Sequence, residues 1–173
     1  MALFNLDKLS QTLGLKKEDI EYALDAFDKA ELLNINNPNS ISIDALLTKK
    51  KAFFMSPSVR IALLSAIYGD NIPDSASSKI WEDIVMMYLC RIVSKSMISF
   101  SAEKSSVNPD FIIETRDCPI VVEVGTKKTT TKQLSKYRQK IRYGILINAG
   151  DTEIEFNDKN KTLILPMSWF LMI

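Results

Sequence analysis

The chain has 173 residues, a formal charge of +1, 46% hydrophobic and 25% charged residues. These values are typical of a globular protein with one ordinary domain, or a small domain and a medium one. The sequence contains no histidine, which excludes Ser-His-Asp triads, Cys-His pairs, HExxH zinc sites and the zinc deaminases. It also lacks the glycine-rich motifs of nucleotide-binding loops. Carboxylate and lysine chemistry remains, with or without a hard cation.

The cysteine content and the apolar runs indicate the cellular setting. Cys90 and Cys118 are far apart and have no metal-ligand spacing, which favours a reducing compartment. The first residues lack a charged leader followed by an apolar core, and the longest apolar run, 163–173, is too short to span a bilayer. We therefore expect a soluble, cytoplasmic protein with no membrane partner.

Two helices are predicted at the start of the chain. Asn5 is a suitable N-cap for a helix over residues 6–13, which Gly14 would close. Apolar side chains at helical spacing predict a second helix over residues 17–30.

Two short strands, 32–35 and 41–43, are predicted after these helices. Two helices followed by a two-stranded wing predict a partial winged-helix module over residues 1–48. The second helix carries five acidic residues, which would repel phosphates: Glu18, Asp19, Glu21, Asp25 and Asp28. We interpret the module as an interdomain or protein–protein element, and a transcription regulator that reads DNA through it is disfavoured.

Residues 49–173 are predicted to form a second domain. Ser56-Pro57 begins a helix that ends at Gly69, and a loop separates it from an amphipathic helix over residues 79–94. The elements predicted beyond it are strands over 97–101, 110–115 and 120–124, a helix over 127–142, strands over 143–147 and 162–165, and a short terminal helix. This order predicts an α/β fold, with a mixed sheet flanked by helices.

Two acidic residues, Asp110 and Glu123, lie on what we predict to be one hairpin. If Thr115 pairs with Ile120, the two carboxylates become diagonal neighbours roughly 5–8 Å apart. Carboxylates that close repel each other unless a cation lies between them, so the pattern indicates a Mg²⁺ site. The alternative is that both are solvated on the outer face of an edge hairpin.

The order helix, three strands, helix, strand, with Pro109-Asp110 on the second strand and Glu123 on the third, resembles the PD-(D/E)XK nuclease superfamily. The wider chain resembles the C-terminal region of prokaryotic AAA-type ATPases, where a winged helix precedes a nuclease-like domain of unknown function. Besides the hairpin, the stretches that carry this resemblance are 32–35, 51–60, 80–85 and 164–166. The resemblance implies a restriction-endonuclease-like fold over residues 49–173, and an ATPase motor domain or other protein subunits as partners.

The resemblance also implies a metal site. In such nucleases an acidic residue of the first core helix, here Glu82, joins Asp110 and Glu123 around Mg²⁺. The implied activity is Mg²⁺-dependent DNA endonuclease chemistry, the hydrolysis of phosphodiesters. For Glu82 the alternative is an ordinary polar position on an amphipathic helix, because Asp83 is equally acidic.

The catalytic lysine of the family departs from its pattern here. It belongs two residues after Glu123, and this chain has Gly125 there. Either Lys127 or Lys128 takes over its role, since lysine has a long flexible stem, or the site is degenerate.

A basic segment follows Gly125. No acidic residue occurs from there to Arg142, and such a segment suits a nucleic-acid backbone, because each neutralised phosphate releases counterions. The residues expected to contact DNA are Lys127, Lys128, Lys132, Gln133, Lys136, Arg138 and Lys140. The alternative is a solvated lysine face. The two hypotheses for the whole chain are a DNA-interacting nuclease-like domain and a non-catalytic protein–protein interaction or oligomerisation module, with a homo-oligomer allowed by both.

Overall fold

A computed structural model describes residues 2–40, 42–101, 108–125, 141, 143–150 and 153–173. The chain forms two compact units, Met1–Cys90 and Arg91–Ile173, and each is described by itself below. The division follows Cys90, whereas the sequence analysis placed a boundary after residue 48. Residues 49–90 therefore belong with the N-terminal elements.

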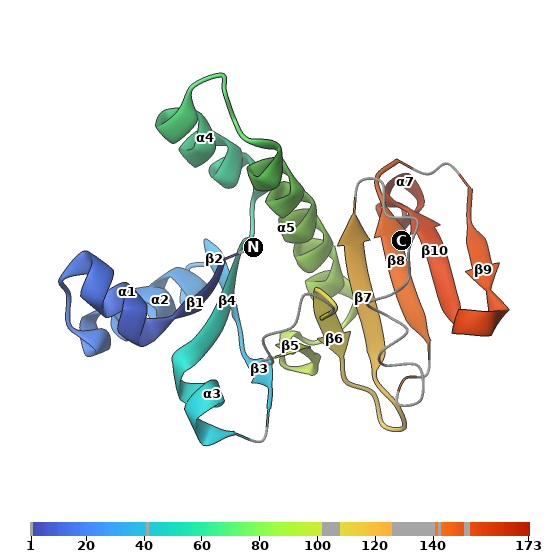
Figure 1. Ribbon diagram of the computed structural model, residues 1–173, viewed down its shortest axis with the longest axis horizontal. Helices are drawn as coiled ribbons and strands as arrows, with labels where there is room; N and C mark the ends of the chain where they lie inside the picture. The colour runs from blue at the N-terminus through green and yellow to red at the C-terminus, as the bar shows by residue number, and fades with distance from the viewer. Residues whose placement is uncertain (1, 41, 102–107, 126–140, 142, 151–152) are drawn as a thin grey trace. The chain divides into compact units, whose positions relative to one another are not determined.

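The first unit is built on a small antiparallel sheet with the strand order β1-β4-β2. Helices α1 and α2 contact each other and strands β1 and β2 (Figure 1). The elements are β1 (Ala2–Asn5), α1 (Leu6–Leu13), α2 (Lys17–Lys29), β2 (Leu33–Asn36), β3 (Pro38–Asn39), α3 (Ile43–Thr48), β4 (Lys49–Phe54), α4 (Pro57–Tyr68) and α5 (Asp74–Ile92), of which α5 ends just past the unit boundary.

Local capping chemistry sets the bounds of α1, as predicted. The side chain of Asn5 accepts a hydrogen bond from the Lys8 backbone N–H at 3.1 Å. At the other end, Gly14 adopts a left-handed conformation with φ 66° and ψ 22°, and its N–H donates to the Ser10 carbonyl. Both ends satisfy backbone groups that the helix itself leaves unpaired.

The predicted strand over residues 41–43 is wrong. Ser42 instead caps α3, accepting a hydrogen bond from the Ala45 N–H. The strand that returns along β2 is β4, which pairs with β1 on its other side. Strand β4 was not predicted because it begins with three lysines. Lys51 and Phe53 are nevertheless buried, with the period of two that is typical of a strand.

The second unit contains a mixed sheet with the strand order β5-β6-β7-β8-β10-β9 (Figure 1). Three of these pairings are antiparallel, β5 with β6, β6 with β7 and β10 with β9, whereas β7 with β8 and β8 with β10 are parallel. The elements are η1 (Lys95–Met97), β5 (Ile98–Ser101), β6 (Phe111–Ile113), β7 (Ile120–Gly125), β8 (Gly144–Asn148), β9 (Glu155–Asn157), η2 (Asp158–Asn160), β10 (Thr162–Pro166) and α7 (Met167–Phe170). The predicted α/β class with a mixed sheet and helices is confirmed.

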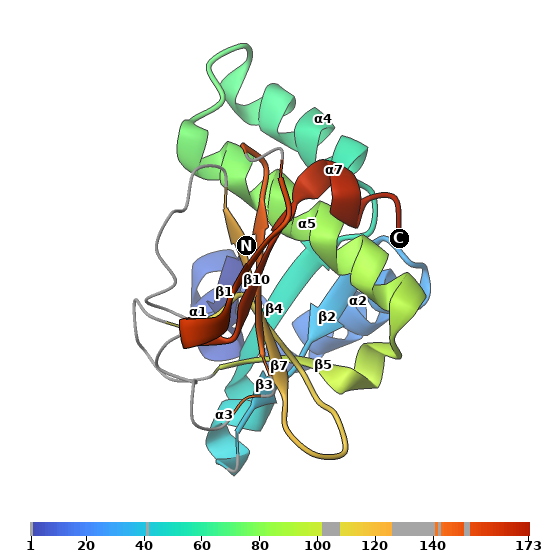
Figure 2. The same cartoon turned by 90° about the vertical axis from the view of Figure 1, so that its right-hand side faces the viewer.

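The core of the second unit lies against β6, β7 and β8. Ile112, Val121, Ile141 and Leu146 form one buried cluster, and Ile164 packs against it. Helix α7, which follows β10 (Figure 2), contacts β8 and β10. It buries Met167 and Phe170. Strand β7 is buried on both faces from residue 121 to 124, as expected for a central strand with neighbours on both sides.

No helix within the described part of the chain combines the length and the apolar character needed to cross a bilayer.

Two glycines that end helices provide a test of the backbone geometry. Gly14 has φ 66° and ψ 22°, and Gly69 has φ 60° and ψ −134°; a Cβ at either position meets nothing within 4 Å. Any penalty for alanine is therefore conformational. Gly14→Ala should cost ~1 kcal/mol of unfolding free energy, because an L-residue tolerates the left-handed helical region, and Gly69→Ala ~2 kcal/mol, because its region is open essentially to glycine. Urea denaturation measures the unfolding free energy of both variants and shows which substitution costs more. Equal losses of unfolding free energy would contradict the assigned backbone angles.

Candidate functional site

The carboxylate of Asp110 lies at the backbone of β7. Its Oδ2 accepts a hydrogen bond from the Val124 N–H at 2.9 Å. Phe111 is paired with Val122, so one further step along the two antiparallel strands brings Asp110 opposite Glu123. The last backbone pair of β6 and β7 on this side is Phe111 with Val122. The side chain of Asp110 adds one further hydrogen bond to β7 beyond that pair. The structure places the two acidic residues at adjoining positions of neighbouring strands.

The register of this hairpin differs from the predicted one. Ile120 pairs with Ile113, not with Thr115, so the ladder is shifted by two residues. The loop is correspondingly longer, and the Thr115 hydroxyl donates to the Cys118 carbonyl inside it at 2.6 Å. Because side chains alternate between faces with a period of two, a shift of two keeps Asp110 and Glu123 on one face. They become opposite instead of diagonal neighbours.

Glu123 is 1% exposed in the middle of β7. Strand β7 has β6 on one side and β8 on the other, so the alternative of two solvated carboxylates on an edge hairpin is wrong for Glu123. Asp110, outside the ladder, is half-buried. A carboxylate in an otherwise apolar central strand is costly to bury, and this marks Glu123 as a position held for a reason other than packing.

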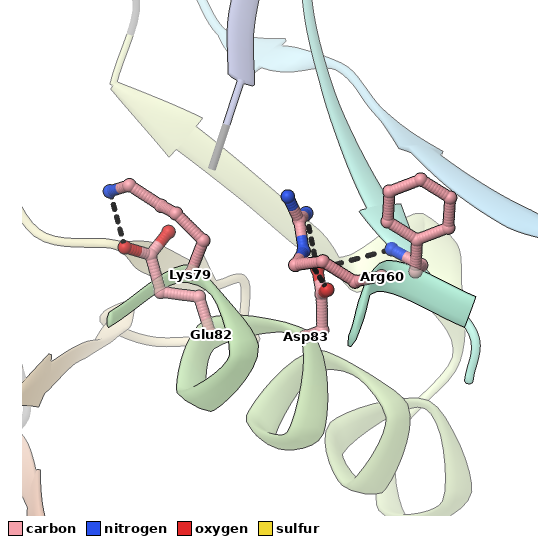
Figure 3. A network of polar contacts seen from close by, with 5 residues as sticks. Arg60, Lys79, Glu82 and Asp83 are labelled. Carbon is pink, nitrogen blue, oxygen red and sulfur yellow. Dashed lines mark hydrogen bonds and ion pairs between the residues drawn. The ribbon is translucent and has the colours of Figure 1, made fainter. Parts of the chain in front are cut away.

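Glu82 lies on α5, in the first unit, and is 5% exposed. Its Oε1 accepts a hydrogen bond from Lys79 Nζ at 2.9 Å, one helical turn earlier (Figure 3). Asp110 and Glu123 belong to the second unit. The three carboxylates of the predicted site thus belong to different units of the chain.

Among the residues that the structure describes, no three Asp, Glu, Cys or His side chains are grouped in a way that would hold a metal ion. What the structure assembles is the pair on β6 and β7. Gly125, where the family has its lysine, is the last residue of β7. The predicted substitutes Lys127 and Lys128 lie outside the described residues, as do the remaining predicted DNA contacts, Lys132, Gln133, Lys136, Arg138 and Lys140.

A buried ion pair in the first unit was not anticipated from the sequence. Asp83, one residue after Glu82, is fully buried, and its Oδ2 accepts a hydrogen bond from Arg60 Nε (Figure 3). Its Oδ1 accepts from Arg60 Nη2 at 2.9 Å and from the Phe54 N–H at 3.1 Å. The Arg60 guanidinium also lies 4.8 Å from the centre of the Phe54 ring, within the range of a cation–π contact.

The Asp83 network connects three elements of the first unit. Phe54 ends β4, Arg60 is in the first turns of α4, and Asp83 is in α5. Burial raises the pKa of the Asp83 carboxyl, and the hydrogen bonds and charge of Arg60 and the Phe54 N–H oppose that rise. The signal available in the sequence was Arg60 itself, the single charged residue of an otherwise uncharged helix.

A cavity of about 290 Å³ in the first unit lies beside α2. Three acidic residues of that helix, Glu21, Asp25 and Asp28, contribute to its wall. Lys50, on β4, is the basic residue of the lining and donates to Asn37 Oδ1 at 2.7 Å and to the Leu46 carbonyl. Burial lowers the pKa of this lysine, and Glu21 opposes the shift. The wall of this cavity on the α2 side is thus acidic.

Comparison with known proteins gives one informative similarity. The chain is 27% identical over 171 residues to the uncharacterized protein MJ1637 of Methanocaldococcus jannaschii. The match covers 98% of this chain and 35% of that relative, so the chain spans about a third of the relative's length. No family model matches the sequence, and no solved structure matches it.

The Asp83 network predicts a large effect of a nearly isosteric change. Asp83→Asn keeps the volume but removes the charge that compensates Arg60, whose side chain is 13% exposed. Breaking a buried pair in this way should cost about 3 kcal/mol. Chemical denaturation followed by circular dichroism measures the difference.

Asp25→Asn is the matched control for this prediction. Asp25 pairs with Lys29 at 2.7 Å, but the two side chains are 57% and 76% exposed, and solvent screens such pairs. The control should leave the unfolding free energy unchanged within error. Equal losses in the two variants would show that the network around Asp83 does not hold the first unit together.

Proposed function

We propose that this chain is the DNA-interacting, nuclease-like C-terminal portion of an AAA-type ATPase. In this proposal a partial winged-helix module precedes a domain of the restriction-endonuclease type. The observation that carries the proposal is the adjoining placement of Asp110 and Glu123 on β6 and β7. An ATPase motor domain is the expected partner.

The strand pairing of the second unit supports the nuclease-like fold. Three consecutive strands, β5, β6 and β7, pair antiparallel, and β8 then joins β7 in parallel. Helix α5 precedes them in the chain. The predicted helix over residues 127–142 falls almost wholly outside the described residues. The other elements follow the order that the resemblance to PD-(D/E)XK nucleases implies, with the aspartate directly before the second strand and the glutamate inside the third.

The N-terminal elements support the winged-helix part of the proposal. Helices α1 and α2 are followed by β2 and β4, which pair antiparallel in the manner of a wing. Strand β1 adds to the other edge of β4. Because α2 is acidic, we propose that this module contacts protein and that DNA contacts come from elsewhere in the chain.

The residues at the site suit a magnesium ion. Magnesium prefers oxygen ligands and keeps several waters, so one or two carboxylates suffice to hold it. Asp110 and Glu123 supply these, and the Val124 N–H fixes one oxygen of Asp110 beside β7. Glu82 is the proposed third ligand. When bound, the ion would acidify a water and neutralise charge on a phosphate.

Gly125 limits what the site can do without help. A glycine has no group to position at the phosphate, so cleavage requires Lys127 or Lys128 to supply the missing ammonium. DNA contacts come from the same segment, through Lys127, Lys128, Lys132, Gln133, Lys136, Arg138 and Lys140. Catalysis and DNA binding therefore depend on different features of the segment. Catalysis requires one lysine to take the place of the lysine missing at Gly125, whereas DNA binding depends on the summed charge of the segment.

A second candidate function is a non-catalytic interaction or oligomerisation module of the ATPase. The observation that favours it is helix α4, which exposes apolar side chains along its whole length.

Cation binding tests the proposed site. The 173-residue chain should bind Mn²⁺, used as a probe for Mg²⁺, and Glu123→Gln should weaken that binding at least tenfold, because one of few charged ligands is lost. Glu155→Gln is the matched control, since Glu155 is an exposed glutamate on β9 of the same unit. Calorimetric titration measures all three proteins.

Equal Mn²⁺ affinity in all three proteins, or no binding by the parent chain, would contradict the metal site. If the parent chain cuts plasmid DNA when Mn²⁺ is present, Lys127→Ala and Lys128→Ala identify the substitute lysine by loss of cutting. If it binds Mn²⁺ without cutting, the site is a degenerate one.

DNA affinity tests the basic segment independently of the metal. Lys132→Ala combined with Lys136→Ala should weaken binding to duplex DNA about equally for unrelated sequences, and should reduce the slope of log K against log salt by about 2, because two phosphate contacts are lost. Lys159→Ala, an exposed lysine of η2, is the control. Fluorescence anisotropy across a salt series measures the slopes, and an unchanged slope in the double variant would rule out this segment as the contact.

A further inference from the structure

Helix α4 (Pro57–Tyr68) has no buried residue. Its large apolar side chains are exposed on several sides of the helix: Val59 37%, Ile61 43%, Leu63 48%, Ile67 69% and Tyr68 47%. A helix that is apolar all round is ordinarily surrounded by other protein. Figure 1 shows α4 past the end of β4, joined to α5 by a short connection.

The attachment of α4 within its own unit uses one side of the helix. Arg60 and Leu64, one turn apart, are the members of the helix interior that are half-buried. Arg60 reaches Asp83 on α5 through the buried ion pair. The exposed apolar side chains lie on the remaining sides, so the ion pair orients the helix and leaves most of its surface unpacked.

The exposed surface of α4 carries no charge. Arg60 is the single charged residue of the helix and is occupied by Asp83. Ala62 and Ala66 are one turn apart and both exposed, and small side chains at this spacing let two helix axes approach closely. A surface that is uncharged and contains a strip of small residues can pack against an identical copy of itself without like-charge repulsion.

We propose that α4 is the dimerisation helix of this protein, and that its exposed apolar side packs against α4 of a second copy about a two-fold axis. In such an isologous contact the same residues serve both chains. The large apolar side chains exposed on α4 are of the kind that marks a protein–protein contact. Burying them on both copies, with the atoms around them, approaches the roughly 1,000 Å² of a specific interface.

This proposal goes beyond the nuclease-like function and does not depend on it. If the Asp110–Glu123 pair binds no cation, the self-association of α4 is unaffected. If α4 does not self-associate, the proposed metal and DNA contacts in the second unit are unaffected.

The experiment compares two isoleucines of similar exposure in the full 173-residue chain. Ile67, in α4, is 69% exposed, and Ile43, in α3, is 72% exposed. Light scattering coupled to size exclusion should give the mass of a dimer for the parent chain. Ile67→Glu should raise the dissociation constant at least tenfold and give a monomer at the same concentration, whereas Ile43→Glu should remain a dimer. Circular dichroism should show that both variants are folded.

Disulfide trapping supplies a second, local measurement. Ala62→Cys and Ala66→Cys place thiols on the proposed contact, and Ile43→Cys places one away from it, with Cys90 and Cys118 common to all three. Mild oxidation should link copies through at least one of the α4 variants and not through the α3 variant. A monomeric parent chain, equal effects of both glutamate substitutions, or an absence of linkage in both α4 variants would overturn the proposal.

Discussion

The buried pair between Arg60 and Asp83 is the interaction on which the first unit depends. Asp83 is buried where helix α5, strand β4 and helix α4 meet. A buried carboxylate without a partner of opposite charge is strongly destabilising. The carboxylate is accommodated by two bonds from the guanidinium and one from the Phe54 N–H. The fork geometry of arginine fixes direction as well as distance, so the pair ties the first turns of α4 to α5.

The second unit contains a different kind of buried charge. Glu123 occupies a central strand whose other positions are an isoleucine, three valines and the terminal Gly125, and packing alone would favour an apolar residue there. Asp110 is tied to the next residue of the same strand by its hydrogen bond to the Val124 N–H. The buried acid of the first unit is paired with an arginine, and the two acids of the second unit lie at adjoining positions of neighbouring strands.

Local chemistry allowed part of this structure to be predicted, and long-range pairing accounts for what was missed. The bounds of α1 follow from Asn5 and Gly14, whose conformational preferences act within one turn. Strand β4 was missed because Lys51 suggests a solvated segment, and its burial depends on partners distant in sequence. The predicted hairpin register was wrong by two residues because the loop, 114–119, extends past the turn-forming residues 116–119. The prediction that Asp110 and Glu123 share one face does not depend on this shift. The only local signal of the ion pair is that Arg60 is the single charged residue of its helix, and this signal does not identify residue 83 as the partner.

The sheet of the second unit ends at β9, a strand of three residues whose antiparallel partner is β10. Glu155 is exposed on this strand, and the chain turns away directly after it into η2. An edge strand this short that carries a charged side chain offers few unpaired N–H and C=O groups with which a strand of another molecule could pair. Fibril-like growth by strand addition is therefore discouraged at this edge of the sheet.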